Sequence, residues 1–123
     1  MLRNAVAAAF ALLLVSGGHS RAQGMNFPEF SPEARQGGAL FMGKCASCHG
    51  AFAQGTDKGP PLVHKIYEPG HHSDEAFILA IRRGSRQHHW SFGDMPPVEG
   101  DADSDIPPII LYVRELQRAN GIH

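Results

Sequence analysis

The stretch Cys45-Ala46-Ser47-Cys48-His49 places two thiols and an imidazole within five residues. On one helical turn, side chains three positions apart lie on the same face, so Cys45 and Cys48 can present both sulfurs to one partner. This pattern is the one that attaches haem covalently, through a thioether from each sulfur to a vinyl group. His49, the next residue, can then ligate the iron. The stretch therefore predicts a haem c site, around which the rest of the chain folds.

Three other uses of the two cysteines have to be weighed against this prediction. A CxxC pair can be a redox dithiol, but that use is typical of alternating strands and helices, which the sequence does not indicate. A zinc site needs further ligands, which only the later histidines supply. A disulfide between such near neighbours would close almost no loop and would stabilise little. Haem attachment is the interpretation that we favour.

The first residues of the chain have the pattern of a secretory signal. Arg3 precedes an apolar run from Ala5 to Val15, and the small residues Ser20 and Ala22 stand at the expected cleavage positions. We therefore expect a cleaved signal at residues 1–22 and one domain at residues 23–123. The apolar run is too short to span a bilayer comfortably, so we expect no stable membrane insertion after cleavage. An uncleaved membrane anchor is the alternative.

Composition limits the classes of partner. The 123 residues carry 11 basic and 12 acidic side chains, a formal net charge of −1, and this lack of a basic excess argues against nucleic acid. A domain this small is marginally stable, so a large apolar cofactor would add substantially to its core. Covalent attachment after export would need the thiols kept reduced in an oxidising compartment, which implies a dedicated maturation system.

The first and second predicted helices have clear start and stop signals. Ser31 is a good N-cap and Pro32 suits the first helical position, and the buried side of this helix follows at helical spacing. A second helix is predicted from Asp74 to Arg83, with Ser73 or Asp74 as its cap and Gly84 as its stop. The apolar positions expected to be buried are Ala34, Gly37, Leu40 and Phe41 in the first helix and Phe77, Ile78 and Ile81 in the second.

A last helix is predicted to begin near Asp105 and to stop at Asn120-Gly121. Pro107 and Pro108 then fall in the first turn, where backbone N–H groups have no helical partner in any case. Its buried face is expected to comprise Ile106, Ile109, Ile110, Val113 and Leu116.

Residues 50–67 and 85–104 lack a sustained hydrophobic period and are rich in Gly and Pro, so both are predicted as loops. Loops this long in a compact domain are usually functional or enclose something. The predicted fold class is therefore all-α, with three to four helices and long loops wrapped around one covalently attached haem.

A second iron ligand decides the function, and Met95 is the best candidate. It lies in Phe92-Gly93-Asp94-Met95-Pro96-Pro97, where two prolines stiffen the backbone, and a thioether ligand raises the reduction potential. Two alternatives stay open: Met95 can be core filler or exposed, and a histidine can be the ligand instead. Met25 and Met42 are poorer candidates by position. The candidate histidines are His64, His71, His72, His88 and His89.

With these features, residues 23–123 resemble the class I cytochromes c, most of all the small exported bacterial type with one haem. Gly37 and Phe41 precede Cys45 at the positions where this family places a glycine and an aromatic residue of its first helix. By this resemblance, the two terminal helices cross nearly at right angles at Gly37, with Ile109 and Tyr112 on the last helix packed against the first.

The resemblance also implies roles for site residues. Gly59-Pro60-Pro61-Leu62 is similar to a Gly-Pro-x-Leu element whose proline carbonyl accepts a hydrogen bond from the haem histidine, which assigns Pro60 to His49. Leu62 would then lie on the haem, and the Trp90 indole N–H would donate to a propionate. The chain departs from the family at Pro107 and Pro108 and in the histidine-rich segment between Leu62 and Met95.

The pairs His71-His72 and His88-His89 are unusual, and with His64 they can in principle bind copper or zinc. Adjacent side chains usually point apart, however, and no carboxylate spacing fixes a geometry. We therefore interpret the histidines as parts of polar loops that meet water, propionates or backbone carbonyls.

The predicted function is one-electron transfer in the periplasm by a monomeric carrier with a His49/Met95-ligated haem c, not an enzyme. The redox partners would be a dehydrogenase or membrane complex and a terminal oxidase or reductase of a respiratory chain. The alternatives are a haem enzyme or gas sensor with an open sixth position, although no acid–base pair for peroxide chemistry is evident, and an electron-entry subunit of a larger oxidoreductase.

Overall fold

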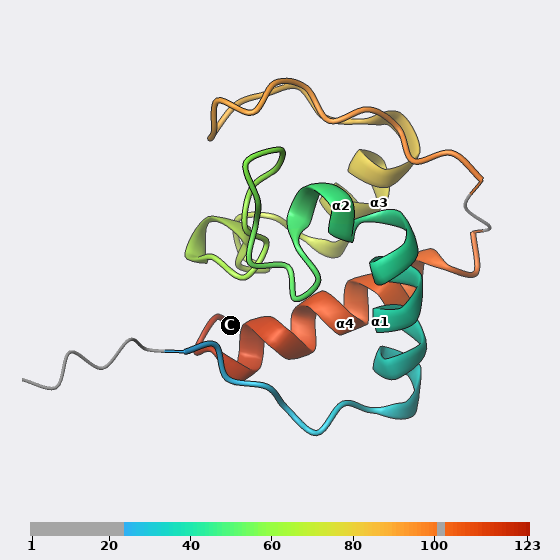
Figure 1. Cartoon of the computed structure of the whole chain (residues 1–123), viewed down its shortest axis with the longest axis vertical. Helices are drawn as coiled ribbons and strands as arrows, with labels where there is room; N and C mark the ends of the chain where they lie inside the picture. Colours follow the sequence, from blue (N-terminus) through green and yellow to red (C-terminus); the bar gives the residue numbers. More distant parts are fainter. Residues whose placement is uncertain (1–23, 101–102) are drawn as a thin grey trace, which may run out of the picture.

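The fold is built on two crossed helices, α1 (Pro32–Lys44) and α4 (Ile106–Ala119) (Figure 1). The computed structural model describes residues 24–100 and 103–123. The predicted signal at residues 1–22 therefore lies outside the described residues. Between the two long helices lie α2 (Ala46–His49), the 3-10 helix η1 (Lys65–Tyr67) and α3 (Asp74–Arg83). The all-α prediction is confirmed, with four α-helices and no β-strand in the described ranges.

The predicted helix signals act as expected. Ser31 caps α1, its Oγ accepting the Ala34 N–H at 3.1 Å, and Pro32 begins the helix. The second predicted helix has the expected bounds, and Gly84 ends it with φ 76°. Ile81 is its one fully buried apolar residue, whereas Phe77 and Ile78 are half-buried against the core.

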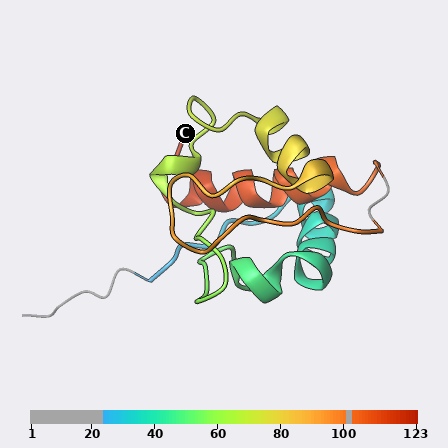
Figure 2. The same ribbon diagram turned by 90° about the horizontal axis from the view of Figure 1, so that it is seen from above.

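Helices α1 and α4 approach so closely at Gly37 that a side chain there has no room. A Cβ on Gly37 would overlap the carbonyl oxygen of Pro108, and one on Gly38 would lie 3.0 Å from the Tyr112 ring. The Phe41 and Tyr112 rings pack with centroids 5.4 Å apart. The two helices cross steeply in both views (Figures 1 and 2). The crossing at Gly37 expected from the resemblance is therefore present, and the absence of a side chain is its physical cause.

The start of α4 differs from the sequence expectation in one detail. Asp105 occupies the N-cap position, but its side chain makes no capping hydrogen bond and instead lies 3.7 Å from the Lys44 ammonium group. Pro107 and Pro108 lie in the first turn without breaking the helix, as expected. All five predicted core residues of α4 are buried: Ile106, Ile109, Ile110, Val113 and Leu116.

Two polar side chains on α4 hold the loop that precedes α3. Arg114 is 5 % exposed and donates to the carbonyls of Tyr67 at 2.8 Å and His72 at 2.6 Å, and to the Asp74 carboxylate at 2.8 Å. Gln117 donates to the carbonyls of Leu62 and Tyr67 at 2.8 and 3.0 Å. The backbone carbonyls of Leu62, Tyr67 and His72, on either side of and within η1, are thus bonded by side chains of α4.

The segment of residues 85–100 runs out from α3 and back beyond the two crossed helices (Figures 1 and 2). It is irregular as predicted, except that Ser85 and Met95 form an isolated antiparallel bridge. Within the described ranges, no helix has the length and apolar character needed to cross a membrane.

Candidate functional site

The loops and helices enclose a cavity of about 410 Å³, within the range of about 300–1,000 Å³ typical of ligand sites. Six of the seven predicted site residues line it, although they come from three separate segments of the chain, residues 45–49, 60–62 and 85–100. Cys48 does not line the cavity and is exposed. The six lining residues are Cys45, His49, Pro60, Leu62, Trp90 and Met95.

Apolar side chains make up most of the wall. Phe41, Ile81 and Val113 contribute from the core, and Leu79 and Phe92 also line the cavity. The last two are 49 % and 39 % exposed, which is costly for large apolar side chains that face a common space. A flat apolar group in the cavity would remove this surface from water.

His49 is fixed at the end of α2 and is only 8 % exposed. Its Nδ1 lies 2.9 Å from the Pro60 carbonyl oxygen, as the resemblance implied. Because a carbonyl only accepts, Nδ1 carries the proton and Nε2 keeps its lone pair. Burial lowers the pKa of His49, and the hydrogen bond to Pro60 partly opposes that shift. The neutral ring that results is the form that binds metal ions.

The segment that carries Pro60 packs directly on the helix that carries His49. A Cβ on Gly59 would lie 2.9 Å from the Cys48 carbonyl oxygen, so glycine permits this approach. Thr56 Oγ1 donates to the same carbonyl at 2.6 Å, and the Leu62 N–H donates to Ala53 at 2.8 Å. These contacts place the Pro60 carbonyl opposite the imidazole.

Met95 is held at the cavity wall by its backbone. It exchanges both main-chain hydrogen bonds with Ser85, at 2.8 and 2.9 Å. Gly84 lies so close that a Cβ on it would overlap the Met95 carbonyl oxygen. The rival methionines do not line the cavity: Met25 packs against the core, and Met42 on α1 is 52 % exposed.

Trp90 presents a buried indole N–H that makes no hydrogen bond of ordinary geometry to any described residue, although it lies close enough to the Tyr67 hydroxyl to influence it. Its Nε1 has no hydrogen-bond partner among the described residues, which is rare for a buried N–H. The ring packs edge-on against His64, with centroids 5.1 Å apart. Tyr67 also lines the cavity; burial raises the pKa of its hydroxyl, and the nearby Trp90 indole partly opposes the shift. An acidic group of a bound molecule would satisfy the indole.

The match to a family of known proteins agrees with this geometry. The family model for cytochrome c matches residues 34–117, well over half of the chain. The chain belongs to the cytochrome c family. Proteins of this family bind haem c covalently and use its iron for electron transfer, so redox partners are implied in general. No curated protein matches the chain. The apolar cavity, the neutral imidazole of His49 and the unpartnered Trp90 indole all fit that cofactor.

The histidine-rich segment of this cytochrome c differs from the sequence expectation. His72, His88, His89 and Arg86 line the cavity, so groups capable of acid–base chemistry do stand at its wall. The expectation that adjacent histidines point apart is also wrong here, because loop residues 71–72 and 88–89 converge. Burial lowers the pKa of His72; its hydrogen bond to the Ile66 carbonyl opposes this shift, and its cationic neighbours reinforce it.

Sequence reasoning missed the residues that position this cytochrome c site. Arg114 and Gln117 flank the apolar face of α4, and polar side chains beside such a face were the available signal. No local sequence pattern marked Tyr67 or Ser85 in advance. Each is a single residue outside the α-helices, and the partner of each residue lies further along the sequence.

Proposed function

We propose that this cytochrome c is an exported, periplasmic one-electron carrier that binds haem c through Cys45 and Cys48, with His49 and Met95 as the iron ligands. When bound, haem c supplies an iron that takes up and releases one electron. The observation that carries the proposal is that His49 and Met95 line one cavity while each is fixed by main-chain contacts.

On the proximal side, His49 would bind through Nε2, because Nδ1 donates to Pro60. This hydrogen bond fixes the ring and raises the basicity of the ligand nitrogen. Cys45 lines the cavity and Cys48 is one helical turn further on, in the relation that two thioether bonds need.

On the opposite ligand side, support for Met95 comes from the Ser85 bridge, which fixes the backbone that carries the thioether. His72, His88 and His89 also line the cavity and are the alternative ligands on this side. A preformed thioether site would keep both oxidation states in one geometry and would exclude small ligands from the iron. We assign Leu62 to contact with the haem plane and the Trp90 N–H to a propionate, since that indole otherwise lacks a partner.

We propose further that residues 1–22 are removed on export and that residues 23–123 work as a monomer. The short positive start and apolar run of the leader support export. The partners would be a dehydrogenase or membrane complex and a terminal oxidase or reductase.

The test is an absorption spectrum of the ferric protein purified after export, followed by carbon monoxide addition to the reduced form. A weak far-red band of sulfur-to-iron ligation, with no carbon monoxide binding, is expected for the carrier. Absence of the band together with ready carbon monoxide binding would reject Met95 as the ligand.

A second candidate function is a haem enzyme with an open sixth position. The observation that favours it is the presence of Arg86, His88 and His89 at the cavity wall, since imidazole and guanidinium groups can move protons and stabilise developing charge. The carbon monoxide experiment separates the two functions, because only an open iron binds the gas readily.

A further inference from the structure

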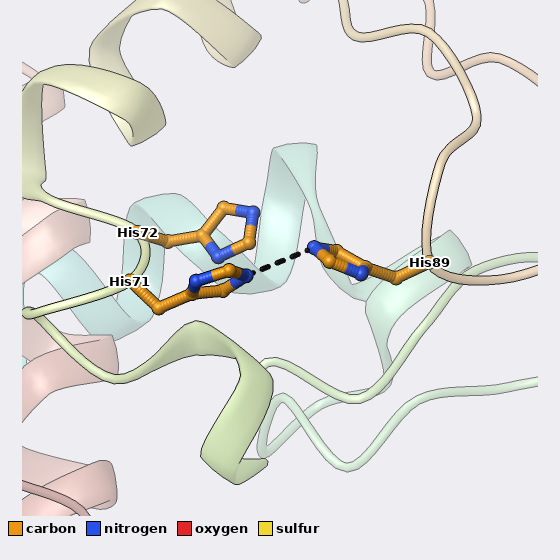
Figure 3. Close-up of side chains that lie close together, drawn as sticks. All are labelled: His71, His72 and His89. Atoms are coloured by element: carbon orange, nitrogen blue, oxygen red, sulfur yellow. Dashed lines mark hydrogen bonds between the residues drawn. The ribbon is translucent and has the colours of Figure 1, made fainter.

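Four histidines from two loops meet at one edge of the haem cavity. His71 and His72 follow η1, and His88 and His89 lie on the segment after α3, so the cluster joins loops distant in the sequence. Figure 3 shows three of the four, His71, His72 and His89. His71 Nε2 lies 3.2 Å from His89 Nε2, and His72 Nε2 lies 3.3 Å from His88 Nε2. One ligand nitrogen from each of His71, His72 and His89 falls within 4.8 Å of the others.

Two neutral rings cannot form a hydrogen bond at the contact between His72 and His88. His72 Nδ1 lies 2.7 Å from the Ile66 carbonyl oxygen, and His88 Nδ1 lies 2.7 Å from the Arg86 carbonyl oxygen. Because carbonyls only accept, both Nδ1 atoms carry the proton, and both Nε2 atoms are left with lone pairs. These two lone pairs face each other at 3.3 Å, an arrangement that becomes favourable when one of the rings gains a proton or when both bind a metal ion.

The separation between His71 and His89 is that of two ligands of a tetrahedral ion. Zinc binds imidazole nitrogen at about 2.0–2.1 Å, so two such ligands at a tetrahedral angle lie about 3.3–3.4 Å apart. The His71–His89 contact of 3.2 Å is close to this separation, as is the 3.3 Å contact between His72 and the adjoining His88, and the ligand atom of His72 lies within 4.8 Å of the other two. Metal-binding histidines also usually donate their second ring N–H to a carbonyl or carboxylate, as His72 and His88 do here.

We propose that His71, His72 and His89, with His88 adjoining them, bind one divalent transition metal ion of the zinc or copper class. Imidazole is a good ligand for both metals. Arg114 supports the site indirectly, because it donates to the His72 carbonyl at 2.6 Å and so fixes the backbone that carries His71 and His72. The metal site rests on the proposed function in one respect, because it requires that Met95 and not one of these histidines is the sixth ligand of the haem; the far-red band and carbon monoxide binding test that ligand separately.

The haem itself competes with a metal ion for these histidines, because His72, His88 and His89 also line the haem cavity. Propionates could accept hydrogen bonds from these rings and hold them away from a metal ion. The experiment must therefore use the haem-loaded protein, in which this competition is present.

Isothermal titration of the haem-loaded protein with zinc ions at neutral pH tests the proposal. We expect saturable binding of one zinc per chain. His71→Ala and His89→Ala should each weaken the affinity by at least about 100-fold, the upper end of the loss from removing a merely supporting group. Both side chains are exposed, so these variants should keep the fold, and His123→Ala at the exposed chain end is the matched control.

The ring nitrogens identify the ligands directly. In histidine ring NMR spectra of the reduced protein, zinc should shift the Nε2 resonances of His71, His72 and His89 and leave His64 unchanged. The proposal is overturned if no saturable binding occurs in the haem-loaded protein, which would leave the cluster to the propionates. Zinc binding that persists with unchanged affinity in both His71→Ala and His89→Ala would overturn the proposal as well.

Discussion

Ser85 and Met95 exchange both of their main-chain hydrogen bonds, the Met95 N–H donating at 2.8 Å and the Ser85 N–H at 2.9 Å. This is the hydrogen-bonded pair of an antiparallel ladder reduced to a single bridge. The bridge connects Ser85, which follows the end of α3, to Met95, the proposed sulfur ligand. The end of one helix therefore positions a residue that lies ten positions after Ser85 in the chain.

Gly84→Ala should disturb the Met95 side of the site. The position has φ 76°, and an added Cβ would overlap the Met95 carbonyl oxygen, so the bridge must shift. We expect the far-red band to weaken and carbon monoxide to bind, while haem stays covalently attached. Gly121→Ala has the same φ of 76° with nothing within 4 Å and controls for backbone strain alone. An unchanged spectrum in Gly84→Ala would show that this approach does not hold the ligand.

Met95→Ala should lower the reduction potential markedly and allow carbon monoxide to bind, because a soft sulfur ligand favours the reduced iron. Potentiometric titration and difference spectra measure the two effects. Met42→Ala, at an exposed position on α1, should leave both unchanged. If the potential of Met95→Ala equals that of the parent protein, the sixth ligand is another residue, and His72, His88 and His89 become the candidates.

Gly37→Ala should destabilise the fold strongly, since the new methyl group would overlap Pro108 backbone atoms that cannot move without displacing α4. Overpacking of a core costs about 1–3 kcal/mol, and a backbone clash belongs at the upper end. Gly43→Ala, in the same helix with nothing within 4 Å, should instead stabilise by up to about 1 kcal/mol. Urea unfolding measures both; similar values for the two variants would refute the close crossing.

Arg114→Met should lower the free energy of unfolding by about 1–3 kcal/mol, because the half-buried His72 carbonyl loses its donor. Asp74→Asn should cost less than about 1 kcal/mol, since this carboxylate is 58 % exposed and Arg114 keeps its carbonyl partners. Arg118→Met, exposed on the same helix, is the control. Equal effects at positions 114 and 118 would contradict the role of Arg114.

Stability should fall at alkaline pH partly through Tyr112. Burial raises the pKa of its hydroxyl above the ordinary 10.0. Between 10.0, the value in the unfolded chain, and the raised pKa in the folded chain, the unfolded chain has lost a proton that the folded chain keeps. The contribution of Tyr112 to the free energy of unfolding is therefore complete below pH 10.0 and is lost as pH rises through the folded pKa. Tyr112→Phe should flatten this decline in urea unfolding, and at neutral pH should cost about 1 kcal/mol for the lost hydrogen bond to Ala51. An equally steep decline in the variant would contradict this.

Local signals predicted the helices well because each signal acts within one turn. Ser31 caps its own helix, Gly84 ends one, and the apolar spacing from Ile106 to Leu116 marks a buried face. The Asp105 side chain escaped prediction, because Lys44 on another helix competes for it. The histidine pairs escaped it for the same reason: the position of a loop side chain depends on distant loops.

The sequence by itself determined the haem attachment pattern, the all-α class, the start of α1, the bounds of α3 and α4, and the membership of residues 34–117 in the cytochrome c family, whereas η1 lies within a predicted loop. Only the tertiary structure decided which distant groups meet: Ser85 with Met95, Arg114 with the loop before α3, and two histidine pairs with each other. The physical reason is range. Capping, helical periodicity and the CxxCH spacing act over a few residues, whereas these contacts depend on where α4 and its buried Arg114 and Gln117 anchor the loops.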